Sequence, residues 1–174
     1  KSLLEQKNIA IISDAGLPSV SDPGQGLIYE AIQKKIQVCV IPGANAALNA
    51  IIASGMLSKE FCFSGFIPQK GKIKYFQKFS QILFPIIFYE TSHRLHDSVS
   101  KMLQTFGNRK LVIARELTKK FEEYIYTTLK EFADNPRKVK GEITVVIEGK
   151  TDNEQNNIST QIQATFTLEE IIDH

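Results

Sequence analysis

The chain has 174 residues, of which 43% are apolar and 23% are charged. This length and balance are normal for a globular protein with one domain or two small ones. The net charge of +2 gives by itself no reason to propose nucleic-acid binding. No run approaches the roughly 20 apolar residues that a membrane helix needs. The N-terminal segment is not typical of a secretion signal, so we expect a cytoplasmic protein.

The cysteine and histidine content argues against a metal site. Cys39 and Cys62 are far apart in apolar surroundings, and no Cys-x-x-Cys pair or cysteine–histidine cluster occurs. This pattern indicates two buried thiols in a reducing compartment rather than a disulfide framework. His93 and His96 are one helical turn apart, but no carboxylate or further histidine completes a site beside them. We therefore expect no bound metal.

The first predicted elements are a strand, a loop, a helix and a second strand. Residues 9–12 form a short apolar run that is typical of a strand buried on both faces. Residues 13–24 are rich in turn formers, and a helix with one apolar face follows at residues 27–32. Residues 37–41 form the next apolar run, which Pro42-Gly43 stops. This order predicts a parallel crossover connection.

The later part of the chain contains a second and longer set of predicted elements. Helical spacing or capping signals predict helices over residues 45–54, over residues 72–83, from about 93 to 106 and from 128 onward. Apolar or alternating runs predict strands at residues 86–89, 111–114, 121–129 (a strand or hairpin arm) and 142–148. These elements alternate as they do in an α/β fold.

Composition and element order together predict two domains. Residues 1–42 look like the C-terminal part of a first α/β domain, which is incomplete, and residues 43–150 look like a fuller second α/β domain. Residues 151–174 are rich in Asn, Gln, Ser and Thr at their start, so we interpret them as a polar linker followed by the start of a helix.

Two segments with small residues are candidates for binding a ligand through the backbone. Residues 13–18 follow a predicted buried strand, and ligands in open parallel sheets bind at the carboxyl ends of strands. Asp14 could equally stabilise a turn, and the pattern alone favours that interpretation. Asn45 and Ala46 begin a helix whose free amides could hold a carboxylate. An ordinary Asn N-cap is the alternative, and the pattern alone favours it.

The densest polar cluster lies at residues 89–94, where a predicted strand ends and a helix begins. Glu90, His93 and Arg94 could supply a base, a proton shuttle and a phosphate clamp. A structural ion pair, with Ser92 as the helix cap, is the alternative, and the pattern does not separate the two.

Basic residues follow the next predicted strand and precede the last one. Arg115, Lys119 and Lys120 could hold RNA phosphates, and Lys140 belongs to a similar basic turn. The alternative is a solvated charged loop, which each segment favours on its own. The joint placement is more informative, because five polar or glycine-rich clusters adjoin apolar strands, as in a site built along one edge of α/β sheets.

Seven segments resemble the tetrapyrrole-methylase superfamily, the class III methyltransferases, over about residues 9–149. Within it they are similar to the branch that methylates a cytidine 2′-hydroxyl of small-subunit ribosomal RNA. These segments are Ser13-Asp14-Ala15-Gly16-Leu17-Pro18, Ser21-Asp22-Pro23-Gly24, Ile41-Pro42-Gly43, Gly65-Phe66-Ile67-Pro68, Phe88-Tyr89-Glu90-Thr91-Ser92-His93-Arg94, Ala114-Arg115-Glu116-Leu117-Thr118-Lys119 and Lys140-Gly141-Glu142.

The resemblance implies a two-domain α/β fold, a homodimer, and S-adenosylmethionine in the cleft between the domains. Residues expected to contact this cofactor are Asp14, Ala15, Gly16, Leu17, Pro18, Asn45, Ala46, Tyr89 and Leu117. Candidates for assisting methyl transfer, among which the base is not assigned, are Glu90, His93, Arg94, Arg115, Glu116 and Lys119. Candidates for binding ribosomal RNA are Arg94, Arg115, Lys119, Lys120 and Lys140.

The chain departs from the family pattern at its ends. Members of the family begin upstream, with a further strand and a Pro-x-x-x-Gly-Asn loop, and they continue beyond residue 174. We therefore interpret the chain as a fragment and expect it to bind the cofactor weakly or not at all and to be inactive alone. Two alternatives remain: a methylase of a tetrapyrrole or another small molecule, and a non-catalytic module for RNA binding or dimerisation.

Overall fold

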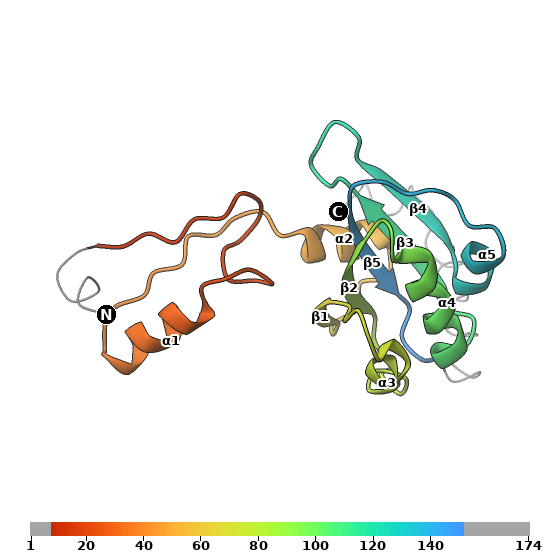
Figure 1. Cartoon of the computed structure of the whole chain (residues 1–174), viewed down its shortest axis with the longest axis horizontal. Coiled ribbons are helices and arrows are strands. Elements are labelled where there is room, and N and C mark those ends of the chain that lie inside the picture. Colours follow the sequence, from red (N-terminus) through yellow and green to blue (C-terminus); the bar gives the residue numbers. More distant parts are fainter. Residues whose placement is uncertain (1–7, 152–174) are drawn as a thin grey trace, which may run out of the picture.

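The computed structural model describes residues 8–151, which form a sheet-based α/β domain and an arm, residues 8–44, that extends away from it (Figure 1). The linker and helix predicted after residue 151 lie outside the described residues. None of the described helices is long and apolar enough to cross a membrane. Within residues 8–151, no group of three or more His, Cys, Asp or Glu residues could hold a metal ion.

A mixed five-stranded sheet forms the centre of the domain. Its strands are β1 (Cys62–Phe66), β2 (Ile86–Thr91), β3 (Lys110–Arg115), β4 (Glu123–Thr128) and β5 (Glu142–Ile147). Their order across the sheet is β1-β2-β5-β3-β4, so the last strand of the chain lies in the middle. β1 runs parallel to β2, and the other three neighbouring pairs are antiparallel.

Helices cover both faces of this sheet. One face packs against α3 (Lys72–Gln77), α4 (Leu95–Phe106) and α5 (Leu129–Asp134), and we call it the α4 face. The other face packs against α2 (Ala46–Ser54), and we call it the α2 face. Side chains alternate between the two faces along each strand. In β2, Phe88 therefore belongs to the core of the α4 face and Ile87 to the core of the α2 face.

Most of the predicted elements after residue 43 are confirmed, together with the signals that end them. Asn45 caps α2 by accepting a hydrogen bond from the Leu48 amide at 3.1 Å, and Gly55 follows the helix with φ +69°. Thr128 caps α5 in the same way. The predicted extent of one helix was wrong, because α3 ends at Gln77 and passes into turns instead of reaching residue 83. The strand β1 was not predicted.

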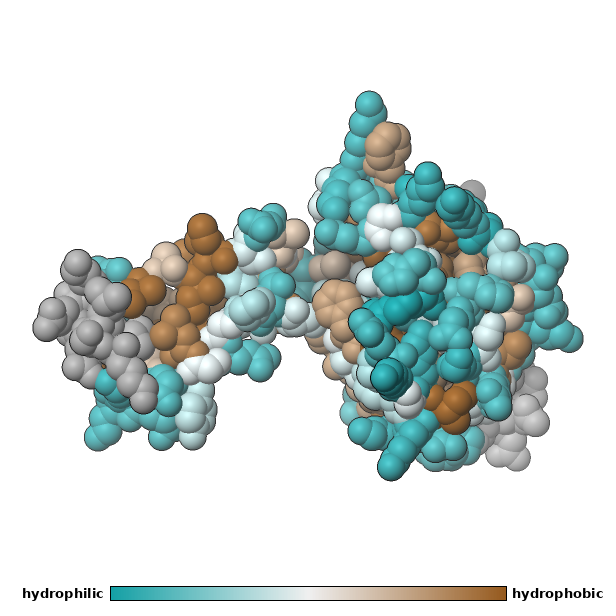
Figure 2. Space-filling view, viewed as in Figure 1, coloured by the Kyte–Doolittle hydropathy of each residue, from teal (hydrophilic) through white to brown (hydrophobic). Residues whose placement is uncertain are grey.

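The strands predicted at residues 9–12 and 37–41 are not formed, although α1 (Gln25–Gln33) follows the first of them as expected. Strands require a hydrogen-bonded neighbour, and within the described residues neither segment has one. Apolar side chains in both remain exposed, including Ile12 (88%), Val40 (72%) and Ile41 (84%). The space-filling view shows this hydrophobic surface gathered on the arm (Figure 2). Cys39 is also exposed and Cys62 is half-buried, so the prediction of two buried thiols was wrong.

Gly149 lets the chain after β5 pass directly over the segment before β2. A Cβ atom at this position would overlap the Leu83 carbonyl group and would lie 2.5 Å from the Phe84 nitrogen. We expect Gly149→Ala to destabilise the domain by about 2 kcal/mol, because rigid backbone would have to move. Urea unfolding measures this loss. Gly26→Ala is the matched control, because nothing lies within 4 Å of its Cβ position and it should not be destabilising. Equal stability of the two variants would contradict the prediction.

Candidate functional site

The strand register brings several of the predicted polar segments to one edge of the sheet. Thr91 at the end of β2 pairs with Glu142 at the start of β5, and Arg115 at the end of β3 pairs with Ile143. Arg115 also pairs with Glu123 at the start of β4. The segments that follow β2 and β3 therefore lie beside the segments that precede β4 and β5. The sheet is largely antiparallel, so this shared edge combines strand beginnings with strand ends.

The loop of residues 13–22 packs closely against the turn before α2 and against β1. A Cβ atom on Gly16 would lie 3.5 Å from the Ala44 carbonyl oxygen, and one on Gly65 would lie 3.1 Å from the Ser21 hydroxyl. Both glycines have φ near +70°, a conformation that other residues adopt only under strain. Asp22, rather than Asp14, holds this loop, because its carboxylate accepts a hydrogen bond from the Ser13 hydroxyl at 2.7 Å.

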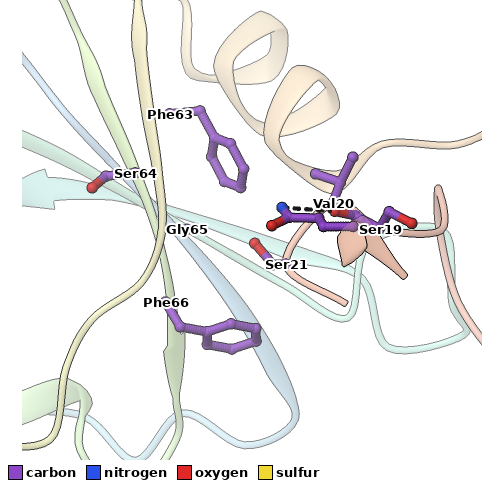
Figure 3. Close-up of a pocket in the computed structure, with 8 residues that line it drawn as sticks. Ser19, Val20, Ser21, Phe63, Ser64, Gly65 and Phe66 are labelled. Atoms are coloured by element: carbon purple, nitrogen blue, oxygen red, sulfur yellow. Dashed lines mark hydrogen bonds between the residues drawn. The ribbon is translucent and has the colours of Figure 1, made fainter. Parts of the chain in front are cut away.

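A pocket of about 520 Å³ lies where this loop meets β1 (Figure 3). The Phe63 and Phe66 rings point from β1 toward the loop, while Ser64 points away from it. The Ser19 hydroxyl is buried and has no hydrogen-bond partner within the described residues. The lining residues are Ser19, Val20, Ser21, Gln25, Phe63, Ser64, Gly65 and Phe66. The pocket thus offers aromatic surface, which is a feature of small-molecule sites, whereas the Ser19 hydroxyl lies against Gly24.

Tyr89 connects this pocket with the first turn of α2. Its ring makes edge contacts with Phe63 and Phe66, with centroids 4.9 Å and 5.4 Å apart. Burial raises the pKa of the Tyr89 hydroxyl, the negative charge of Asp22 raises it further, and a hydrogen bond with the Ala47 backbone opposes both. The hydroxyl therefore stays protonated at neutral pH and can donate a hydrogen bond.

Several of the predicted cofactor residues lie on the α2 face, and they differ in how far their side chains are free to contact a ligand. Leu117 is half-buried and packs against the same core as Tyr89. The amide oxygen of Asn45 is engaged as the cap of α2, which agrees with the ordinary capping alternative. Ala46 is the first residue of that helix. The 14–18 segment approaches them through Leu17, which lies near the Cβ position of Gly43.

Phe63 and Phe66 were not among the predicted site residues. The signal available in the sequence was Gly65, which belongs to one of the segments that carry the family resemblance. Its positive φ marks a close backbone approach, and the two aromatic residues that flank it lie on the wall of the pocket.

Glu90 faces the opposite side of the sheet from Tyr89. Its side chain is completely buried, with 0% exposure, and it forms ion pairs with Lys72 at 3.6 Å and with Arg94 at 2.8 Å. It also accepts hydrogen bonds from the Ser98 hydroxyl and from the Thr91 amide. Both oxygens of the carboxylate are thus engaged. This arrangement favours the structural ion pair over a base at this position.

Lys72 extends the same buried network toward α4. Its ammonium is only 3% exposed and donates hydrogen bonds to Asp97 at 2.8 Å and to the Ser98 hydroxyl at 2.7 Å. Arg94 donates from Nε to the Thr91 hydroxyl at 2.9 Å while it pairs with Glu90. The network therefore holds the turn that connects β2 to α4. Ser92 does not cap this helix, whose N-cap residue is Arg94.

Asp97 makes the network sensitive to acid. Hydrogen bonds from Lys101 and Lys72 lower the pKa of this carboxyl below its ordinary value of 3.8. A lowered pKa in the folded state stabilises the protein above the unfolded pKa, and this contribution is lost as the pH falls through the folded pKa. We expect Asp97→Asn to be less stable than the parent chain at pH 7, and we expect this difference to shrink as the pH falls through the lowered pKa of the folded state. Urea unfolding over a pH series tests this, and a pH-independent difference would contradict it.

Arg115 lies on the α4 face at the same edge of the sheet. Its guanidinium pairs with Glu123 at 3.1 Å, and Arg137 pairs with the other oxygen of Glu123 at 2.6 Å. These two cations lower the pKa of the Glu123 carboxyl, with Arg137 the larger cause. The Arg115 Nε is buried without a hydrogen-bond partner among the described residues. Arg115 thus retains one unused donor.

Glu116 anchors the loop after β3 to the start of β5. Its carboxylate accepts a hydrogen bond from the Glu142 amide at 2.8 Å, and this bond, followed by the charge of Lys119, lowers its pKa. Lys119 pairs with both Glu116 and Glu142, at 3.4 Å and 3.0 Å. Gly141 has φ +95°, and a Cβ atom there would overlap the Glu116 side chain. The basic turn before β5 therefore requires this glycine.

The predicted site residues thus divide between the two faces. Tyr89, Leu117 and the 13–22 loop belong to the α2 face, whereas Glu90, Arg94 and Arg115 belong to the α4 face. The side chains at the edge itself are exposed. They are His93, Lys119, Lys120 and Lys140.

The chain is similar in sequence to a known protein family. A family model described as Tetrapyrrole (Corrin/Porphyrin) Methylases matches residues 1–133. The chain is 41% identical over 172 residues to "Ribosomal RNA small subunit methyltransferase I" of Bacillus subtilis, with 97% of this chain and 59% of the relative covered. A protein of the same name from Halalkalibacterium halodurans is 44% identical over 151 residues, with 84% and 52% covered. The chain therefore spans between about half and three fifths of these relatives.

Solved structures share the fold at lower identity. The methyltransferase CobJ superposes with a TM-score of 0.57 at 20% identity, over 77% of this chain and 62% of that one. Uroporphyrin-III C-methyl transferase from Thermus thermophilus, in complex with S-adenosyl homocysteine, superposes with a TM-score of 0.56 at 17% identity, over 76% and 62%. At these identities the likeness establishes the fold alone.

Proposed function

Because the chain belongs to the tetrapyrrole (corrin/porphyrin) methylase family, we propose that it is part of an S-adenosylmethionine-dependent methyltransferase acting on small-subunit ribosomal RNA. The acceptor is the 2′-hydroxyl of a cytidine, as the sequence motifs imply. The observation that carries this proposal is the identity of 41%, over nearly the whole chain, to a relative named as a ribosomal RNA methyltransferase. The exposed basic side chains along the sheet edge support an RNA substrate.

The pocket on the α2 face supports the proposed cofactor through its aromatic lining. The Phe63 and Phe66 rings form an aromatic wall that suits a nucleobase. Tyr89 and the 14–18 segment would hold the rest of the molecule, together with the first turn of α2. When bound, S-adenosylmethionine supplies a methyl group on a sulfonium, which is a strong electrophile.

The chain's own residues then have two tasks, which are to orient the ribose and to accept its hydroxyl proton. Glu90, Arg94, Arg115 and Glu116 are all engaged in ion pairs. His93 is exposed and makes no ion pair within residues 8–151, so we place it first among the candidates for the base. We also propose Arg94 and Arg115 as contacts for the phosphates that flank the ribose.

Methyl transfer from labelled S-adenosylmethionine to undermethylated small ribosomal subunits tests the function. The chain is compared with a version extended to the length of its relatives. Label on a cytidine 2′-hydroxyl with the extended version supports the proposal. Label on a tetrapyrrole acceptor instead would favour a small-molecule methylase, and RNA binding without label from either version would favour a non-catalytic module.

The chain alone is expected to bind the cofactor weakly. The 13–22 loop belongs to the arm, where two apolar segments lack strand partners among residues 8–151, so half of the pocket rests on weakly supported backbone. Isothermal titration with S-adenosylmethionine should give no binding in the micromolar range for the chain and clear binding for the extended version. Micromolar affinity of the chain alone would refute this expectation.

The family resemblance also implies a homodimer that works in the cytoplasm, and both remain part of the proposal. The exposed apolar residues of the arm support an assembly that covers them, because such surface is costly in water. Light scattering of the extended version measures the assembly. A monomeric mass at the concentrations used for methyl transfer would argue against the dimer.

A further inference from the structure

The loop between β3 and β4, residues 116–122, projects beyond the edge of the sheet (Figure 1). Phe121 lies in this loop and is 65% exposed. The Lys120 ammonium lies 5.7 Å from the centroid of its ring. An exposed aromatic ring is not unusual by itself, so the case for a function depends on how the loop is built and what surrounds it.

The loop is ordered by its own hydrogen bonds. The Lys119 amide donates to the Glu116 carbonyl at 3.0 Å, and the Glu122 amide donates to the Lys119 carbonyl at 3.1 Å. The Glu122 side chain accepts from the Thr118 amide. Glu116 and Thr118 have φ of +50° and +65°, a conformation that non-glycine residues keep only where the surroundings impose it. The loop thus holds Phe121 outward. Because the loop is already ordered, binding a ligand through this ring would cost little further conformational entropy.

A second basic segment, residues 137–141, is held beside the β3–β4 hairpin by two contacts, one from Arg137 and one from Glu142, which directly follows the segment. The Glu116 carboxylate accepts from the Glu142 amide at 2.8 Å, and Arg137 pairs with Glu123 at 2.6 Å. The acidic residues here are therefore occupied by cations or amides. Three exposed ammonium groups have no carboxylate partner within the described part of the chain. They belong to Lys120, Lys138 and Lys140.

We propose that Phe121 stacks on an unpaired base of single-stranded RNA, while Lys120, Lys138 and Lys140 contact the phosphates beside it. Aromatic rings flanked by cations bind single strands in this way, because every base has a face on which to stack. This inference rests on the proposed function, since the loop follows β3, two strands from the end of β2. Neighbouring strands are about 4.8 Å apart, so the end of β3, from which the loop starts, lies about 10 Å from the end of β2, which leads into the turn that carries His93.

RNA fits this surface better than a lipid membrane does. Loops that anchor to membranes need a larger apolar area than one ring provides. Here the ring has the Lys120 ammonium 5.7 Å from its centroid and exposed lysines in the neighbouring basic segment, and such cations attract phosphates rather than an apolar layer.

Fluorescence can report the stacking directly, because the chain contains no tryptophan. Phe121→Trp introduces a single indole at the platform. Leu83→Trp is the matched control, because Leu83 is 58% exposed and precedes β2, at the opposite edge of the sheet. Both variants are titrated with a single-stranded RNA oligonucleotide taken from small-subunit ribosomal RNA, and separately with anionic vesicles. We expect RNA to quench the indole at position 121 and to leave the control unchanged.

Fluorescence anisotropy with a labelled form of the same RNA measures how much Phe121 and the lysines contribute to the binding affinity. Phe121→Ala and Phe121→Leu should each bind roughly tenfold more weakly, because neither side chain can stack, and Phe121→Trp should bind as the parent does. Lys140→Gln should lower the slope of log affinity against log salt by about 0.7, whereas Phe121→Ala should leave that slope unchanged.

The outcomes separate this inference from the proposed function. Full RNA affinity in Phe121→Leu, or equal quenching in both tryptophan variants, would overturn the stacking role even if the extended version methylates ribosomal RNA. A blue shift with vesicles in place of quenching by RNA would also overturn it. Failure of the proposed function appears instead as absence of methyl transfer by the parent extended version.

Discussion

Replacing Glu90 by alanine is expected to lower the free energy of unfolding by about 3–5 kcal/mol. The Lys72 side chain is 3% exposed and would lose a fully buried carboxylate partner, while its other described partner, Asp97, is 54% exposed. Arg94 and the Thr91 amide would lose their acceptor at the same time. Removing one member of a buried ion pair costs far more than removing an exposed pair, because the remaining charge stays away from water without compensation.

Two control variants identify the cause of this loss. Glu148→Ala removes a carboxylate that pairs with the exposed Lys110, and we expect a cost of about 1 kcal/mol or less. Combining Glu90→Leu with Lys72→Met removes both charges and should recover much of the stability lost in Glu90→Ala. Urea unfolding followed by circular dichroism measures all three. A Glu90→Ala variant no less stable than Glu148→Ala would show that the network is not important for stability.

Replacing His93 by glutamine is expected to slow methyl transfer at least a hundredfold in the extended version, because a positioned base contributes about 10²–10⁴ to the rate. His93 is exposed at the sheet edge and makes no ion pair within residues 8–151. Its turn is held by Arg94 and the buried Glu90, so the substitution should leave the fold intact. Radiolabel transfer to small ribosomal subunits measures the rate.

His96 provides the matched control for this experiment. It lies one turn further along α4, is exposed, and has its ring nitrogen 3.4 Å from the Ala133 carbonyl oxygen. His96→Gln should transfer methyl groups at the parent rate. Both variants should bind S-adenosylmethionine as the parent does, which separates a role in catalysis from a loss of cofactor binding. Equal rates for His93→Gln and His96→Gln would remove His93 from the candidates for the base.

The sequence predicted the elements after residue 43 well because local signals and burial agree there. The apolar runs at residues 86–89 and 111–114 became β2 and β3, whose interior positions are almost all buried. The same kind of run failed at residues 9–12 and 37–41. An apolar run indicates that a segment is to be buried, but it does not specify which neighbouring strand completes the backbone hydrogen bonds of that segment. β1 was missed for the opposite reason, since its Ser64-Gly65 pair interrupts the apolar pattern.

The candidate site was predicted only in part, because adjacency in sequence differs from adjacency in space. Tyr89 and Glu90 were grouped in one polar cluster, yet neighbouring strand residues point to opposite faces. Tyr89 therefore reaches the pocket beside α2, while Glu90 is buried beneath α4. The shared edge of the sheet could be anticipated from strand ends. The ties between Glu116 and Glu142 and between Glu123 and Arg137 depend on strand order, which no local pattern specifies.

The central place of β5 in the sheet has a consequence for how the chain folds as it is synthesised. β1 and β2 form one half of the sheet, β3 and β4 form the other, and only β5 joins the halves. A nascent chain can therefore assemble two hairpin-sized units, but it cannot close the domain until residue 147 has left the ribosome. Pairing between strands that are far apart in the sequence slows folding, because the intervening chain loses conformational entropy before the contacts between the strands form. Truncation before β5 should leave two exposed strand edges that invite aggregation.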